Sequence, residues 1–64
     1  MPKQQTVTVF KAENEKGQWL GTISITDREH IDVTTMMRAF NWDELVELGK
    51  TFRAANEFLM DQQQ

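Results

Sequence analysis

Residues 19–26 read WLGTISIT, and this stretch decides the fold because its side chains alternate between two sides of an extended chain. One side carries Trp19, Gly21, Ile23 and Ile25, and the other side carries Leu20, Thr22, Ser24 and Thr26. A period of two is typical of a half-buried β-strand. We therefore expect a strand over about residues 18–26.

The residues before this strand predict a partner for it. Residues 6–13, TVTVFKAE, are rich in β-branched side chains, which favour strands. Between the two segments, Asn14 favours a turn and Gly17 tolerates a positive φ. The sequence thus predicts an antiparallel hairpin of about residues 6–13 and 18–26. We expect its covered face to carry Val7, Val9, Trp19, Ile23 and Ile25.

The segment after the hairpin, IDVTTMMRAF at 31–40, fits two patterns. A helical period places four apolar residues on one face, namely Val33, Met36, Met37 and Phe40. Asp32 is suited to cap such a helix. A period of two gives a third strand instead, which the β-branched Thr34 and Thr35 favour. We favour a short helix over about 32–40 and keep a third strand as the alternative.

The C-terminal third predicts a long amphipathic helix over about residues 42–62. Asn41 and Glu44 have the spacing of a capping box, in an asparagine variant. One apolar stripe at helical spacing consists of Leu45, Leu48, Phe52, Ala55 and Leu59. Gly49 lies inside this helix at a cost of about 1 kcal/mol relative to alanine. It indicates either close packing against another element or a glycine that is merely tolerated.

These elements predict a single α+β domain spanning residues 1–64, in which the long helix packs on the sheet. With 64 residues, such a domain buries only about 60% of the surface of its unfolded chain. The sequence contains no cysteine, so no disulfide can stabilise it. Small cores of this kind are often completed by a second copy or a partner.

Catalysis and metal binding find little support in the sequence. Ser24 and His30 are the only serine and the only histidine, and no oxyanion loop accompanies them. A chain this short can hardly enclose a substrate pocket. The carboxylates of residues 27–32, DREHID, match no metal-ligand spacing. We expect no enzyme activity, catalytic residue, metal or cofactor, and the role of His30 stays open.

Charge and hydropathy argue against other classes of function. The net charge is −3, and the seven basic residues are scattered along the chain, which disfavours nucleic-acid binding. No apolar run approaches the roughly 18 residues of a membrane span. The first residues, MPKQQTVTVF, contain no apolar stretch of signal-peptide length. We expect a cytoplasmic protein that does not associate with membranes.

The most informative feature is a surplus of large apolar side chains over what one hairpin and one helix need. Trp, Phe and Met are enriched at interface cores, and Met adapts to the shape of a partner. The sequence therefore predicts a small non-enzymatic protein–protein interaction or regulatory module that acts as a homodimer, a profile typical of bacterial or phage accessory proteins. The alternative is a dimeric nucleic-acid-associated regulator that uses the scattered basic residues. The predicted interface residues are Trp42, Val46, Phe58 and Met60, with Met36, Met37 and Phe40 as neighbours.

Overall fold

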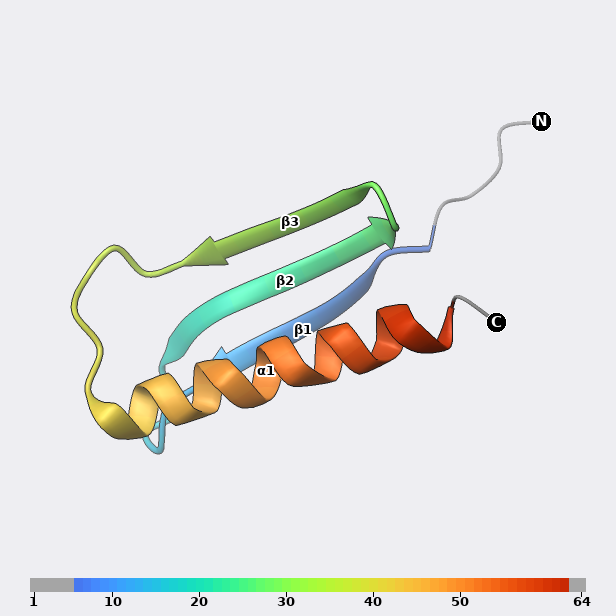
Figure 1. Cartoon of the computed structure of the whole chain (residues 1–64). Helices are drawn as coiled ribbons and strands as arrows, with labels where there is room; N and C mark the ends of the chain where they lie inside the picture. Colours follow the sequence, from blue (N-terminus) through green and yellow to red (C-terminus); the bar gives the residue numbers. More distant parts are fainter. Residues whose placement is uncertain (1–5, 63–64) are drawn as a thin grey trace.

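A three-stranded antiparallel sheet followed by one long helix forms the fold in the computed structural model, which describes residues 6–62. The strands are β1 (Thr8–Glu13), β2 (Trp19–Asp27) and β3 (His30–Thr35), and the helix is α1 (Trp42–Asp61). The sheet order is β1-β2-β3, and α1 runs along the sheet beside β1 (Figure 1). The α+β class, the hairpin and the C-terminal helix predicted from the sequence are confirmed.

The β1–β2 hairpin closes through a loop that Asn14 organises. Its side-chain oxygen accepts hydrogen bonds from the backbone N–H groups of Lys16 and Gln18, both at 2.9 Å. Gly17 takes a φ of 77°, a conformation that glycine adopts without steric cost. The two turn signals in the sequence therefore act at the positions predicted for them.

The predicted covered face of the hairpin is partly wrong, because the ladder contains a bulge. Ala12 pairs with Gly21 and Glu13 pairs with Trp19, so Leu20 is an extra residue in β2. Leu20 turns inward and is fully buried, whereas Trp19 stays exposed. On β1 the covered residues are Phe10 and Ala12, while Val9 is exposed, as is Val7 just before the strand.

The short helix that we favoured over residues 32–40 is absent, and the alternative strand is correct. β3 pairs with β2 from His30 to Thr35, with Thr34 opposite Thr22. The chain leaves the sheet after Met36, whose N–H donates to the carbonyl of Leu20 at 3.0 Å. Residues 36–41 then connect to α1 without regular structure.

The start of α1 is fixed by the predicted capping box. The side chain of Asn41 accepts from the N–H of Glu44 at 2.9 Å, and the Glu44 carboxylate accepts from the N–H of Asn41 at 3.2 Å. These bonds satisfy two N–H groups that a helix start otherwise leaves without a partner. The helix ends at Asp61, one residue before the predicted end.

The core lies between α1 and the first two strands. Its buried hydrophobic residues are Ala12, Leu20, Ile23, Ile25, Leu48 and Ala55. The side chain of Leu48 lies over Gly21, where a Cβ atom would stand 3.2 Å from Leu48 Cδ2 and 3.0 Å from the carbonyl oxygen of Thr34. Gly21 thus allows the helix to approach the sheet closely.

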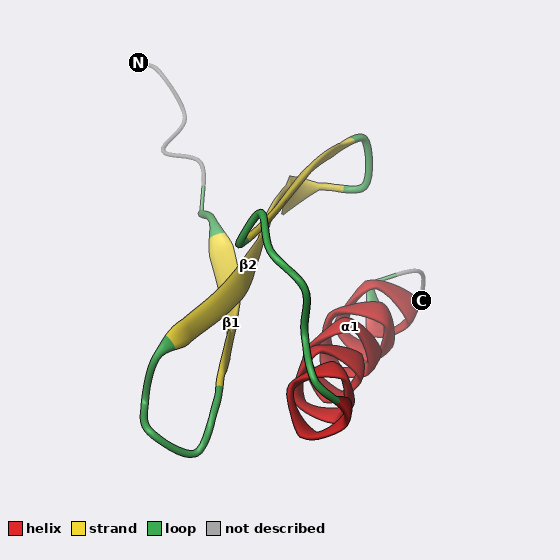
Figure 2. Cartoon of the chain, turned by 90° about the vertical axis from the view of Figure 1, so that its left-hand side faces the viewer, coloured by secondary structure: helices red, strands yellow, loops and turns green. Residues whose placement is uncertain are grey.

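Two residues of the predicted apolar stripe lie outside this core. Leu45 is 55% exposed and Phe52 is 45% exposed, whereas Leu48 and Ala55 are buried and Leu59 is partly buried. The reason is the position of α1, which packs against β1 and β2 and not against β3. Figure 2, a view nearly along the helix, shows α1 on one face of the sheet. The flank of the helix that carries Leu45 and Phe52 therefore has no strand beneath it.

Candidate functional site

His30, one of the residues considered for catalysis, stands at the start of β3 and pairs with Asp27. His30 Nδ1 lies 2.8 and 3.0 Å from the two carboxylate oxygens of Asp27, not beside Ser24. The hydrogen bond from His30, with a second one from the backbone N–H of Glu29, lowers the pKa of Asp27. These contacts close the exposed β2–β3 turn. Within residues 6–62, no group of His, Asp and Glu side chains is placed to hold a metal ion.

Two hollows on the described part of the chain are open to solvent. One, of about 730 Å³, lies between the β2–β3 turn and the end of α1, and Arg28 and Phe58 are among its lining residues. The other, of about 540 Å³, lies between the hairpin loop and the start of α1. Neither Ser24 nor His30 lines either hollow.

Three of the six lysine and arginine side chains within residues 6–62 are paired with acids. Arg38, Lys50 and Arg53 each form an ion pair with a glutamate of α1, at 2.8, 3.3 and 3.3 Å. Within the described residues 6–62, no helix is long and apolar enough to cross a bilayer.

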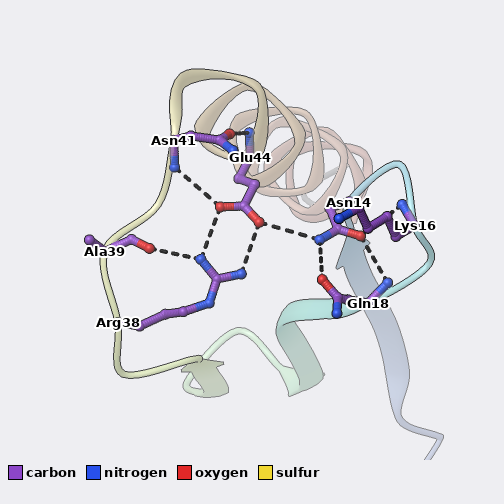
Figure 3. A network of polar contacts seen from close by, with 7 residues as sticks. All are labelled: Asn14, Lys16, Gln18, Arg38, Ala39, Asn41 and Glu44. Carbon is purple, nitrogen blue, oxygen red and sulfur yellow. Dashed lines mark hydrogen bonds and ion pairs between the residues drawn. The ribbon is translucent and has the colours of Figure 1, made fainter.

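The most elaborate polar site is centred on Glu44, a buried carboxylate at the start of α1 (Figure 3). The Arg38 guanidinium donates to both carboxylate oxygens, with Nη1–Oε1 at 3.0 Å and Nη2–Oε2 at 2.8 Å. Asn14 Nδ2 donates to Oε2 at 3.3 Å, and the backbone N–H of Asn41 donates to Oε1. These bonds, that from Arg38 above all, lower the pKa of Glu44 to about 2.

This network joins three segments that are distant in the sequence. Asn14 belongs to the hairpin loop, Arg38 to the β3–α1 connection, and Glu44 to the first turn of α1. Arg38 also donates to the carbonyl of Ala39 at 2.7 Å and lies over the ring of Phe40, with Cζ 5.1 Å from its centroid. These bonds of Glu44 are all made within the fold, and they connect the hairpin loop, the β3–α1 segment and the start of α1.

The predicted interface residues fall into two groups. Trp42, Val46, Met36, Met37 and Met60 are exposed, Trp42 to 76% and Met37 to 98%. Phe40 and Phe58 instead pack against the core. The Phe58 ring meets that of Phe10 edge to face, with centroids 5.8 Å apart. Phe40 and Phe58 are therefore partly buried against the core in the single chain.

Other exposed apolar residues were not predicted as interface residues. Ile31 and Val33 lie on the helix-facing side of β3, since they pair with the buried Ile25 and Ile23. They are nevertheless exposed, as are Leu45 and Phe52 on the neighbouring flank of α1. The alternation of residues 31–35 and the wide apolar stripe of α1 could have indicated these four residues in the sequence. Whether they are buried or exposed, however, depends on which strands the helix covers.

Comparison of the chain with models of protein families, with curated proteins and with solved structures found no match.

Proposed function

We propose that this chain is a small non-enzymatic protein–protein interaction module that acts as a homodimer in the cytoplasm. The observation that carries the proposal is the distribution of apolar side chains. Within residues 6–62, six hydrophobic residues are buried and two of them are alanines, whereas twelve large hydrophobic residues are exposed. Single exposed apolar residues are ordinary on a soluble protein, but contiguous apolar surface marks an interaction site.

The size of the chain supports the same function. A domain of 64 residues without cysteine depends on packing alone for its stability, and a second copy enlarges the buried apolar area. Most soluble oligomers are homo-oligomers, and twofold dimers are the most common among them. A homodimer therefore accounts for the exposed apolar residues without requiring any further component.

Sedimentation equilibrium over micromolar to high micromolar concentrations tests this function. We expect the weight-average mass to rise from 7.5 kDa toward twice that value as the concentration increases. A mass that stays at 7.5 kDa throughout the series would contradict the homodimer.

A further inference from the structure

α1 carries a second line of residues beside its buried face. Trp42, Leu45, Gly49, Phe52, Asn56 and Leu59 follow one another at spacings of alternately three and four residues. This is the spacing of the contact positions of two helices that pack side by side. Trp42, Leu45 and Phe52 are large apolar residues of this line that remain exposed. We call the line the side seam.

The side seam faces the uncovered part of the sheet. On the opposite flank of α1, the Thr51 hydroxyl donates to the carbonyl of Lys11 at 3.3 Å, and Phe58 contacts Phe10. Both contacts are with β1, so the side seam points away from β1 and toward β3. With about 100° of rotation per residue, it lies roughly a quarter turn from the buried face.

Gly49 lies in the middle of the side seam with open space around it. Apart from its chain neighbours and the backbone of its own helix, no atom lies within 4 Å of the position that a Cβ would take. Glycine in a helix interior costs about 1 kcal/mol relative to alanine, and nothing in the single chain requires it here. The close approach of another element would use the space that a side chain would fill.

The exposed apolar area matches what a stable dimer buries. Six residues contribute to it, namely Ile31, Val33, Trp42, Leu45, Phe52 and Met60. Their exposed fractions run from 39% for Ile31 to 76% for Trp42. Large aromatic side chains have 150–250 Å² of surface and the other four are smaller, so together the six present on the order of 500 Å² of apolar surface. A standard interface buries about 800 Å² per partner, of which about 65% is apolar in homodimers.

We propose, on the basis of the homodimer described above, that the α1 helix of a second copy packs in parallel along the side seam and lies over β3. The same contact is repeated in the other direction by symmetry. Two three-stranded sheets then enclose a layer of two helices. The partner's helix covers Ile31 and Val33, which the chain's own helix leaves exposed.

The direction of the partner helix follows from the width of the sheet. Packed helices lie about 8–10 Å apart, and neighbouring strands about 4.8 Å apart. A twofold axis perpendicular to the sheet would make the helices antiparallel and place both sheets in one layer. That axis would run at half the helix spacing from α1. The sheet extends past this point to β3, which α1 does not contact, so the two sheets would collide. An axis along α1 places the sheets on opposite sides of the helices.

In this arrangement identical residues of the side seam face each other. Leu45 meets the partner's Leu45, and Phe52 meets the partner's Phe52. Asn56 meets its own copy, and a single polar asparagine at such a position is a known determinant of parallel two-stranded packing. Gly49 leaves room for the large neighbours on either side.

A charge at Gly49 tests the contact. Gly49→Glu places a good helix former where the single chain has open space, so the helical content of the monomer is retained. The matched control is Ala54→Glu, since Ala54 is exposed on the opposite flank of the same helix. In sedimentation equilibrium we expect Gly49→Glu to weaken dimerisation by at least tenfold and Ala54→Glu to leave it unchanged.

Disulfide trapping tests the direction. The chain has no cysteine, so Leu45→Cys introduces a single thiol. Mild oxidation should link Leu45→Cys into a covalent dimer, whereas Ala54→Cys should form no covalent link, as judged by denaturing electrophoresis without reductant. If the unmodified chain dimerises but Gly49→Glu has no effect, or Leu45→Cys stays unlinked, this arrangement is overturned while the homodimer stands. A chain that is monomeric at every concentration overturns both.

Discussion

Arg38 and Glu44 form a two-pronged ion pair in which each guanidinium Nη atom donates to one carboxylate oxygen, at 3.0 and 2.8 Å. The pair connects the irregular segment after β3 with the first turn of α1. Glu44 also completes the capping box with Asn41 and accepts from Asn14 of the hairpin loop. One carboxylate thus sets where the helix starts and how it sits against the hairpin.

Loss of the Glu44 charge should destabilise the fold in a pH-dependent way. The pKa of Glu44 is lowered from 4.5 to about 2, so its ionised form stabilises the native state above pH 4.5. This contribution is lost as the pH falls from about 4.5 to about 2. We expect Glu44→Gln to lower the melting temperature at pH 7 and to flatten its acid dependence over that range.

The control for this experiment is Glu57→Gln, which removes an exposed ion pair with Arg53. Exposed pairs of this kind contribute little to stability. Thermal unfolding followed by circular dichroism from pH 2 to pH 7 compares the variants. Equal melting temperatures for Glu44→Gln and Glu57→Gln across that series would show that the Glu44 network is not important for stability.

Gly21 in the sheet and Gly49 in the helix should respond in opposite ways to replacement by alanine. At Gly49 a methyl group meets open space, so Gly49→Ala should stabilise the monomer by about 1 kcal/mol. At Gly21 it would stand 3.0 Å from the Thr34 carbonyl oxygen, so Gly21→Ala should destabilise it by about 1–3 kcal/mol. Urea unfolding at low protein concentration measures both. A stabilising Gly21→Ala would refute the close helix–sheet approach.

Two leucines distinguish the core from the exposed flank of the helix. Leu20 is fully buried, so Leu20→Ala should cost about 2–5 kcal/mol of unfolding free energy. Leu45 is half exposed, so Leu45→Ala should change the stability of the monomer by less than about 0.5 kcal/mol while weakening the dimer. Chemical unfolding and sedimentation of the two variants check this contrast. A large loss of monomer stability in Leu45→Ala would place Leu45 in the core.

The sequence predicted the elements with strong local signals. The alternation of residues 19–26, the Asn14 and Gly17 turn residues and the Asn41–Glu44 capping box each act through neighbours close in sequence. Residues 31–40 were harder because their spacing fits both a helix and a strand. Residues 30–35 form a strand because they pair with β2, and this pairing joins residues up to 14 positions apart in the sequence, as in Gly21 with Thr35.

The faces of the elements were less predictable than the elements themselves. The bulge at Leu20 reverses which side of the hairpin is covered near Trp19, and no local pattern marks it. Leu45 and Phe52 belong to the apolar stripe, yet they are exposed because one helix spans only two of the three strands. The candidate interface includes β3, which the helix leaves uncovered. Ile31 and Val33 were missed because the sequence does not show which strands the helix covers.

The concentration dependence of the melting temperature tests the central claim most directly, because association with a second copy stabilises the native state by mass action. The matched variants are Val33→Lys, at 52% exposed on the uncovered β3, and Val9→Lys, at 47% exposed on the other side of the sheet. We predict a melting temperature that rises with protein concentration for the unmodified chain and for Val9→Lys, and stays constant for Val33→Lys. A melting temperature of the unmodified chain that does not change with concentration would contradict the account.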